Sequence, residues 1–188
     1  MRRELVWEML PAIGLEHLAI EIEQDGIVAD GIVVADFGEG GFRLRYSVRC
    51  DGAWRFVGAM LSVDHAGAQR RLEVTRDETG AWKVDGLARP DLAGCTDIDI
   101  MASPLTNTLP VRRLDFAEGL PRRIAVAYIR VPDLTVTRQE QEYTLLGRSG
   151  VGRRFRYHGI GTGFVAEVDV DGDGLVTDYG DIWRRRAG

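Results

Sequence analysis

The sequence predicts a mostly β, single-domain protein whose large antiparallel sheet is rolled or closed so that its edges are hidden. Apolar and polar residues alternate in several stretches of about ten residues, as they do on half-buried strands. Turn sequences rich in Asp and Gly separate these stretches, and the chain contains 23 glycines. No window keeps the 3.6-residue apolar period of a helix, so we expect few or no helices. Curling a long sheet removes its exposed edges.

Four stretches carry the strand prediction. In "LEHLAIEIE" (residues 15–23) the apolar side chains at 18, 20 and 22 share one face, and in "GFRLRYSVRC" (41–50) apolar residues alternate with arginines and a serine. "FVAEVDV" (164–170) alternates in the same way. "RRIAVAYIRV" (122–131) is apolar nearly throughout, which is typical of a strand covered on both faces.

Short turn sequences connect these segments. "QDG", "FGEGG", "CDGAW", "RDETGAW", "KVDG" and "DVDGDG" supply the Asp and Gly residues that hairpin turns require. No Pro- or Ser-rich linker interrupts the chain, and a chain of 188 residues buries roughly 70% of its unfolded surface without any staple. Residues 1–188 are therefore predicted to form one domain.

The stretch "DVDGDGLVTDYG" has part of the pattern of a calcium-binding loop. Asp169, Asp171 and Asp173 occupy the first alternate ligand positions, and Gly174 follows them. The twelfth position, where an EF-hand needs a bidentate Glu, is Gly180, and the flanking residues are typical of strands rather than helices. The pattern therefore predicts a tight turn between two strands.

Composition excludes several classes of function. The net charge is −5 and the arginines are scattered, so no basic stripe for nucleic acid is present. Cys50 and Cys95 lack metal or redox spacing, and we expect two reduced, buried or half-buried thiols. Glu4, Glu8 and Glu16 interrupt the N-terminal apolar residues, and no segment approaches the ~20 apolar residues of a membrane helix. We expect a cytoplasmic protein without a transmembrane segment.

The most unusual stretch is "CTDIDIMASPLTNTLPVRRLDF" (95–116). Asp97 and Asp99 would project from the same face of a strand, roughly 7 Å apart, and they suit either acid–base chemistry or ion pairs with arginine. "SPLTNTLP" is either a rigid capped loop, with Asn107 suited to a left-handed turn, or a polar lip at which Thr106, Asn107 and Thr108 bind a ligand hydroxyl.

Arg112 and Arg113 would face opposite ways on the strand that follows, so only one of them can look into a cavity. An inward arginine needs an acidic residue or an anionic ligand as its partner. Nucleophilic and metal chemistry find little support, because no GxSxG is present and His17, His65 and His158 show no metal-ligand spacing. "GIGTGF" is typical of a β-turn rather than of a phosphate loop.

Several blocks together resemble one bacterial family, described as "putative glycolipid-binding" and formerly a domain of unknown function. They are "GLEHL", "DGAWR", "LAGCTDIDIMASPLTNTLPVRRL", "VPDLTVTRQEQEYT" and "VDVDGDGLVTDYG", in the same order from about Trp7 to Trp183. The resemblance implies a spiral β-roll, a long curled sheet like that of bacterial lipoprotein and lipid carriers. The sequence departs from the family's pattern at four positions. An aromatic residue is expected at Leu105, proline at Gly180, and polar residues at Phe56 and Val57.

Carried over by position, the family's pattern also includes Leu109 and Pro110, and it implies these ligand-binding residues: Trp54, Arg55, Asp97, Asp99, Thr106, Asn107, Arg112, Arg113, Gln141 and Tyr143. We expect a non-catalytic protein that binds a lipid or glycolipid on the concave face of the roll, without a cofactor or metal. Aromatic residues such as Tyr128 would stack on sugars or pack in the core. The alternatives are a structural or protein-interaction scaffold with no ligand cavity, and a hydrolase that uses Asp97 and Asp99.

Overall fold

The computed structural model describes the backbone of residues 1–188 and every side chain except that of Ser149. It contains one 15-stranded sheet and three short helices, η1 (Pro90–Leu92), η2 (Pro104–Asn107) and α1 (Thr108–Arg113). None of these helices has the length and apolar character needed to cross a membrane. The strands are β1 (Arg2–Met9), β2 (Ile13–Ile22), β3 (Gly26–Asp36), β4 (Phe42–Asp51), β5 (Phe56–His65), β6 (Ala68–Arg76), β7 (Trp82–Val84), β8 (Leu87–Ala88), β9 (Cys95–Ile100), β10 (Pro121–Ile129), β11 (Val136–Ser149), β12 (Gly152–Gly159), β13 (Phe164–Val170), β14 (Val176–Tyr179) and β15 (Trp183–Ala187).

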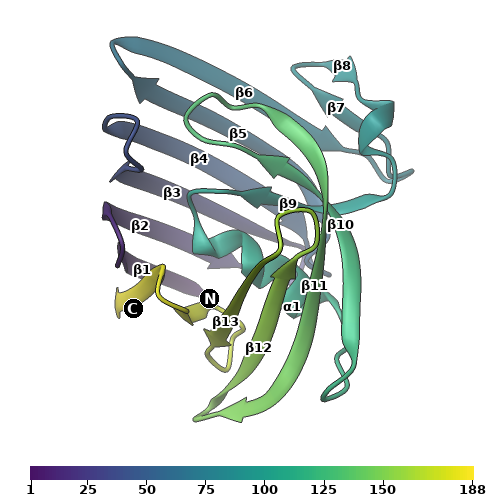
Figure 1. The fold of residues 1–188 in the computed structure, drawn as a ribbon. Coiled ribbons are helices and arrows are strands. Elements are labelled where there is room, and N and C mark those ends of the chain that lie inside the picture. Colours follow the sequence, from purple (N-terminus) through teal and green to yellow (C-terminus); the bar gives the residue numbers. More distant parts are fainter.

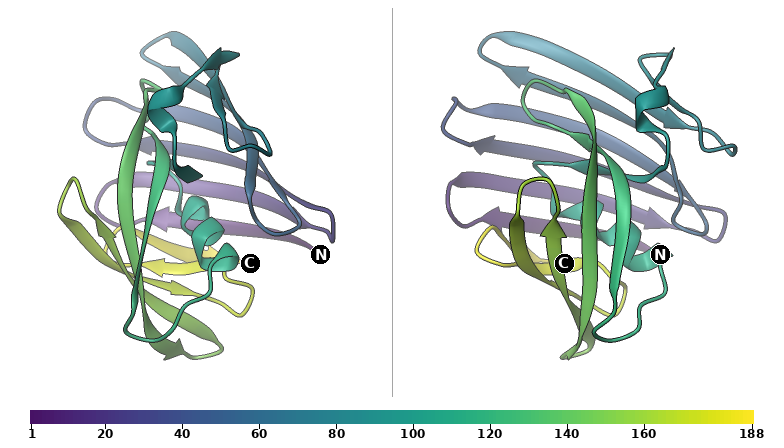
Figure 2. Two further views of the ribbon diagram at one scale, coloured as in Figure 1. Left: turned by 90° about the vertical axis from the view of Figure 1, so that its right-hand side faces the viewer. Right: turned by 45° about the vertical axis from the view of Figure 1, so that its right-hand side comes forward.

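The sheet runs in the order β8-β7-β6-β5-β4-β3-β2-β1-β15-β14-β13-β12-β11-β10-β9. Neighbouring strands are antiparallel except β9 and β10, which are parallel. The first and last strands pair with each other, so the two chain ends lie together in the middle of the sheet. Figures 1 and 2 show β1–β6 as one wall and β10–β13 as the facing wall, with β9 and α1 between them. The predicted mostly β, single curled sheet with few helices is confirmed.

Strand β10 lies at the inner end of this curl and is covered on both faces. Residues 124–127 are all buried, as the apolar run from 122 to 131 predicts. Ala127 and Ile129 face the larger core, which contains Trp7 and Trp183. Val126 faces a second core that fills the curl of the C-terminal strands. The chain therefore builds two adjoining cores around one pair of inner strands.

Aspartates shape several of the hairpin turns in the same way. Asp36, Asp51, Asp77 and Asp171 each accept hydrogen bonds from the backbone N–H groups two and four residues further on. Such side chains replace a backbone acceptor and stabilise the turn locally. The aspartate at the start of each of these four turns thus has the same structural role, which is to accept hydrogen bonds from the turn backbone.

The "DVDGDG" stretch forms the predicted turn between β13 and β14. Its aspartates are ion-paired with arginines of other strands: Asp171 accepts from Arg185 at 2.8 Å and from Arg3 at 3.1 Å, and Asp173 accepts from Arg3 at 2.8 Å. Among the described residues, no group of three or more His, Cys, Asp or Glu side chains is placed to hold a metal ion. These ion pairs connect the turn to β1 and β15, the first and last strands of the chain.

A buried acid connects the N-terminal wall to the segment inside the roll. Glu16 of β2 is fully buried, and its Oε1 accepts hydrogen bonds from the Tyr46 hydroxyl of β4 and, at 2.7 Å, from the Ser103 hydroxyl before η2. Gly31 of β3 lies beneath the Tyr46 ring, and a Cβ there would lie 2.1 Å from the ring. The absence of a side chain at Gly31 lets Tyr46 reach Glu16.

Burial raises the pKa of the Glu16 carboxyl to about 8, and the hydrogen bonds from Tyr46 and Ser103 only partly oppose this rise. Its pKa in the unfolded chain is close to 4.5. Between pH 4.5 and about pH 8, the folded protein therefore keeps a proton on Glu16 that the unfolded chain has released. The contribution of Glu16 to stability is full below the unfolded pKa and is lost as the pH rises through about 8.

We predict that Glu16→Gln flattens the pH dependence of stability between pH 5 and pH 8. The amide stays uncharged, so the variant keeps at high pH the stability that the wild-type protein loses. Denaturant unfolding at several pH values measures this change. Glu21→Gln, an exposed position on the same strand, should leave the wild-type slope unchanged. An unchanged slope in Glu16→Gln would contradict a buried, protonated carboxyl.

Candidate functional site

A cavity of about 280 Å³ lies in the curl of the C-terminal strands. One side is formed by Asp99 of β9 and by the residues around η2, and the other by strands β10 to β15. Polar side chains line it together with a set of aromatic rings that come from separate strands, namely Tyr128, Tyr157, Phe164, Tyr179 and Trp183.

Strand pairing brings these rings together. Tyr128 is the register partner of Asp99 in the parallel pair, and Tyr179 is the partner of Trp183. The Tyr157 ring lies 5.9 Å from the rings of both Phe164 and Tyr179, and the Phe164 and Tyr179 rings are 6.4 Å apart. These tilted and edge-to-face arrangements are the favoured geometries for aromatic pairs. The aromatic wall is therefore packed and preformed.

Asp99 is the acidic group of this cavity. It is half-buried, and its two carboxylate oxygens accept hydrogen bonds from Gln141 Nε2 at 2.5 Å and from Thr106 Oγ1 at 3.1 Å. Burial raises the pKa of its carboxyl, and the two hydrogen bonds oppose that rise. Among the described side chains, no arginine, lysine or histidine forms an ion pair with Asp99.

Asp97, two residues earlier, is in a different environment. It is fully buried and forms a two-pronged ion pair with Arg113, at 2.5 Å and 3.1 Å. Thr96 also donates to it at 2.8 Å. Of the two acids that the sequence places on one face, Asp97 therefore has the structural ion pair, whereas Asp99 reaches a cavity with only neutral partners.

The "SPLTNTLP" stretch is helical. Ser103 caps η2 by accepting from the Leu105 backbone N–H, and Pro104 follows at the first helical position. Asn107 has a right-handed helical φ of −65°, so the expected left-handed turn is wrong. The same segment carries Arg112 and Arg113 on α1, so their expected place on a strand is also wrong. A capping serine followed by proline is a helix-start signal that overrides the surrounding β pattern.

Asn107 lines the cavity and is held in place from behind. Its Oδ1 accepts a hydrogen bond of 2.8 Å from the buried Tyr143 hydroxyl. Thr106 Oγ1 also accepts a hydrogen bond of 3.2 Å from the Ile100 backbone N–H. This bond fixes the Thr106 hydroxyl beside Asp99. Thr106, Gln141 and Tyr143 thus support the cavity by positioning the side chains that line it.

The remaining predicted residues lie elsewhere. Trp54 is buried, and the Arg112 guanidinium lies over its ring at 5.1 Å. Arg55 is exposed, with its guanidinium 3.8 Å from Asp51. Trp54, Arg55 and Arg112 do not line the cavity beside Asp99. They form a separate group on the turn between β4 and β5 and at the end of α1.

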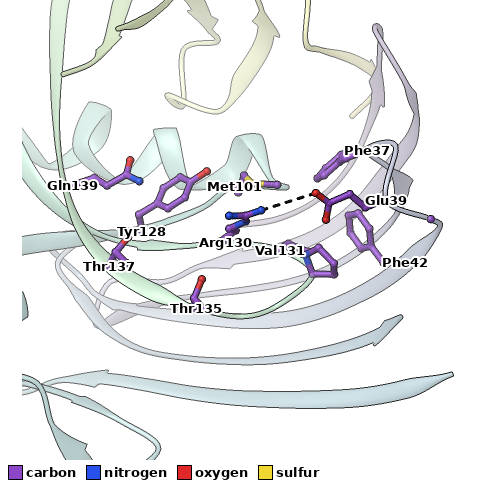
Figure 3. A pocket seen from close by; sticks show the side chains of 12 residues that line it. Phe37, Glu39, Phe42, Met101, Tyr128, Arg130, Val131, Thr135, Thr137 and Gln139 are labelled. Carbon is purple, nitrogen blue, oxygen red and sulfur yellow. Dashed lines mark ion pairs between the residues drawn. The ribbon is translucent and has the colours of Figure 1, made fainter. Parts of the chain in front are cut away.

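A second cavity, of about 430 Å³, adjoins the first and shares Met101, Tyr128 and Gln139 with it. Figure 3 shows its lining, in which Phe37 and Phe42 face Arg130 and Val131. Arg130 and Glu39 form an ion pair across it at 4.0 Å. The two cavities form one cleft, which we call the Asp99 cleft, with an aromatic, acidic end and an end that combines apolar side chains with the Arg130–Glu39 ion pair.

Sequence reasoning missed much of the aromatic wall. Tyr157 shares the buried face of β12 with Phe155, so its inward direction follows from the strand pattern. Phe164, Tyr179 and Trp183 belong to different strands, and nothing local shows that they meet. Glu16 was also missed, although it shares the face of Leu18 in the alternation of β2.

We predict that Arg113→Met destabilises the protein by about 3–5 kcal/mol, because it leaves the buried Asp97 carboxylate without a partner. The neighbouring Arg112→Met is the matched control and should cost less than about 1 kcal/mol, since it removes only an exposed contact with Trp54. Denaturant unfolding compares the two variants. Equal losses would show that the Asp97–Arg113 pair does not support the fold.

Comparisons with known proteins identify the family and the overall fold. The family described as "Putative glycolipid-binding" matches residues 4–185. A crystal structure of a DUF1089 family protein from Pseudomonas aeruginosa is 34% identical in sequence, with a TM-score of 0.80, and the match covers 94% of this chain and 94% of that chain. No curated protein matches the chain. The extent of the family match shows that this chain belongs to the family described as "Putative glycolipid-binding".

Proposed function

We propose that this protein binds a glycolipid-like amphipathic molecule in the Asp99 cleft and does not transform it. The observation that carries the proposal is the junction of two unlike cavities at Tyr128, one with an aromatic wall beside Asp99, the other with an apolar surface around Phe37 and Phe42. A ligand with a polar head and an apolar tail needs both environments side by side. The family description supports this assignment.

The aromatic end suits the head group. The faces of Tyr157, Phe164 and Tyr179 offer flat apolar surface on which a sugar ring stacks. Asp99 and Asn107 lie in the same cavity and offer hydrogen-bonding groups whose positions are fixed by neighbours. Few, firmly held polar groups in a largely aromatic pocket are the usual basis of orientation and specificity.

The adjoining cavity suits the apolar part of the ligand. Phe37 and Phe42 pack edge to face at 5.0 Å, and Met101 and Val131 complete an apolar surface beside them. Methionine adapts its shape to irregular partners, which helps a site accept alkyl chains of different length. The Arg130–Glu39 pair lies at this end, where it can meet polar groups of a lipid.

We predict that the purified full-length protein retains lipid and that Phe164→Ala weakens this binding by roughly fivefold, about 1 kcal/mol for one lost aromatic contact. Native mass spectrometry after incubation with a bacterial lipid extract, followed by solvent extraction, measures the bound fraction and identifies the ligand. Val165→Ala is the matched control, because Val165 is equally exposed on the same strand and lines neither cavity. A protein that stays free of lipid in the extract would overturn the proposal.

A carboxylate-dependent hydrolase is the second candidate. One observation favours it: Asp99 lies at a cavity, and burial raises the pKa of its carboxyl. The pair of carboxylates that such chemistry commonly uses is not available, because Asp97 is occupied by Arg113. We expect no turnover of nitrophenyl glycosides or esters by the wild-type protein. Turnover that Asp99→Asn abolishes would favour the hydrolase instead.

A further inference from the structure

The charge in the aromatic end of the Asp99 cleft is not balanced. Among the side chains that the structure describes, the lining of this cavity contains one carboxylate, Asp99, and no arginine, lysine or histidine. The hydrogen-bond donors of Asp99 are the neutral Gln141 amide and the Thr106 hydroxyl. The two fully buried acids are paired with a cation or protonated: Asp97 has Arg113, and Glu16 is uncharged near neutral pH.

The field of Asp99 reaches the surrounding rings. Burial, and then the charge of Asp99, raise the pKa of the Tyr128 hydroxyl to about 12. The pKa values of Tyr157 and Tyr179 are also raised, chiefly by burial and in part by Asp99. These tyrosines therefore remain neutral phenols whose rings, rather than their charges, face the cavity.

Arg130, the cation that lines the adjoining cavity, does not neutralise the Asp99 carboxylate. It pairs with Glu39 at 4.0 Å and with Asp133 at 3.9 Å, and it lines the second cavity rather than the first. The cavity beside Asp99 therefore offers one carboxyl group without a cationic partner together with several electron-rich aromatic faces.

These two features select the same kind of ligand. A cation gains from a carboxylate and from aromatic faces within about 6 Å, and sites for organic ammonium groups are built from both. An anion would meet an unscreened like charge, and a neutral sugar would leave a buried carboxylate without a counter-charge. A metal ion finds a single carboxylate here, which is too few ligands.

We propose that the head group bound in this cavity carries a positively charged organic nitrogen, held between the Asp99 carboxylate and the rings of Tyr128, Tyr157 and Tyr179. This inference rests on the proposed function, because it specifies the head group of the amphipathic ligand. A quaternary ammonium group and the amine of an amino sugar share the required chemistry.

The test compares probes of equal shape and different charge. The full-length protein is titrated calorimetrically with choline and with 3,3-dimethylbutan-1-ol, in which carbon replaces the charged nitrogen. We expect choline to bind at least tenfold more tightly. Glucosamine and glucose form a second pair, which distinguishes an amino-sugar head group from a quaternary ammonium head group. Octyl glucoside serves as a neutral amphipathic probe of the whole cleft.

Variants locate the effect. Asp99→Asn should weaken choline binding at least tenfold and leave the neutral alcohol unchanged, whereas Asp115→Asn, an exposed acid outside the cleft, should change neither. If Asp99→Asn does not fold, Tyr157→Leu and Tyr157→Phe replace it, since only leucine removes the aromatic face. Choline affinity should fall in the first and persist in the second.

The outcomes separate the two proposals. Octyl glucoside binding with no preference for the charged member of either probe pair would overturn the cationic head group and leave the amphipathic site intact. Binding of none of the probes would overturn both. A preference for choline or glucosamine that survives both Asp99→Asn and Tyr157→Leu would place the cation elsewhere and contradict the inference.

Discussion

The fold depends on a polar crossover that is buried inside the curled sheet. The chain passes from β9 through η2 and α1 to β10 between the two walls, where unpaired polar groups are costly. Several of its polar side chains have partners: Asp97 pairs with Arg113 within the crossover, Ser103 bonds to Glu16 of one wall, and Asn107 bonds to Tyr143 of the other. These contacts hold the crossover in one position and join it to both walls.

The same requirement explains why two nearby aspartates differ. Asp97 lies where Arg113 can reach it from α1, and it becomes part of the support. Asp99 lies two residues further along β9, where it has no ion pair with Arg113 and accepts hydrogen bonds only from the neutral side chains of Gln141 and Thr106. A carboxylate in this state is costly for an empty protein and useful for a protein that binds a ligand there. The candidate site is thus built on a half-buried carboxylate of the crossover that has hydrogen-bond donors but no cationic partner.

The curl of the sheet supplies the rest of the site. Because β10 to β15 wrap around one side of the crossover, rings from several strands converge opposite Asp99. The open end of the same curl continues into the cavity beside Phe37 and Phe42. A sheet that closed completely, or a crossover that filled the curl, would leave no such cleft.

Local patterns in the sequence determined the strands, the aspartate-capped turns and the double-sided burial of residues 124–127, because alternation and turn chemistry act over a few residues. They also placed Asp97 and Asp99 on one face. They misplaced Arg112 and Arg113, since the capping signal at Ser103 and Pro104 outweighs the neighbouring β pattern.

Only the tertiary structure decided which aspartate is paired, that Tyr46 donates a hydrogen bond to Glu16, and that Tyr157, Phe164 and Tyr179 meet. These contacts join residues that are far apart in the chain, and they depend on the register and curl of the whole sheet. Sequence alternation states which face of a strand a side chain occupies. It does not state what lies across from that face, and that is where the chemistry of this protein is set.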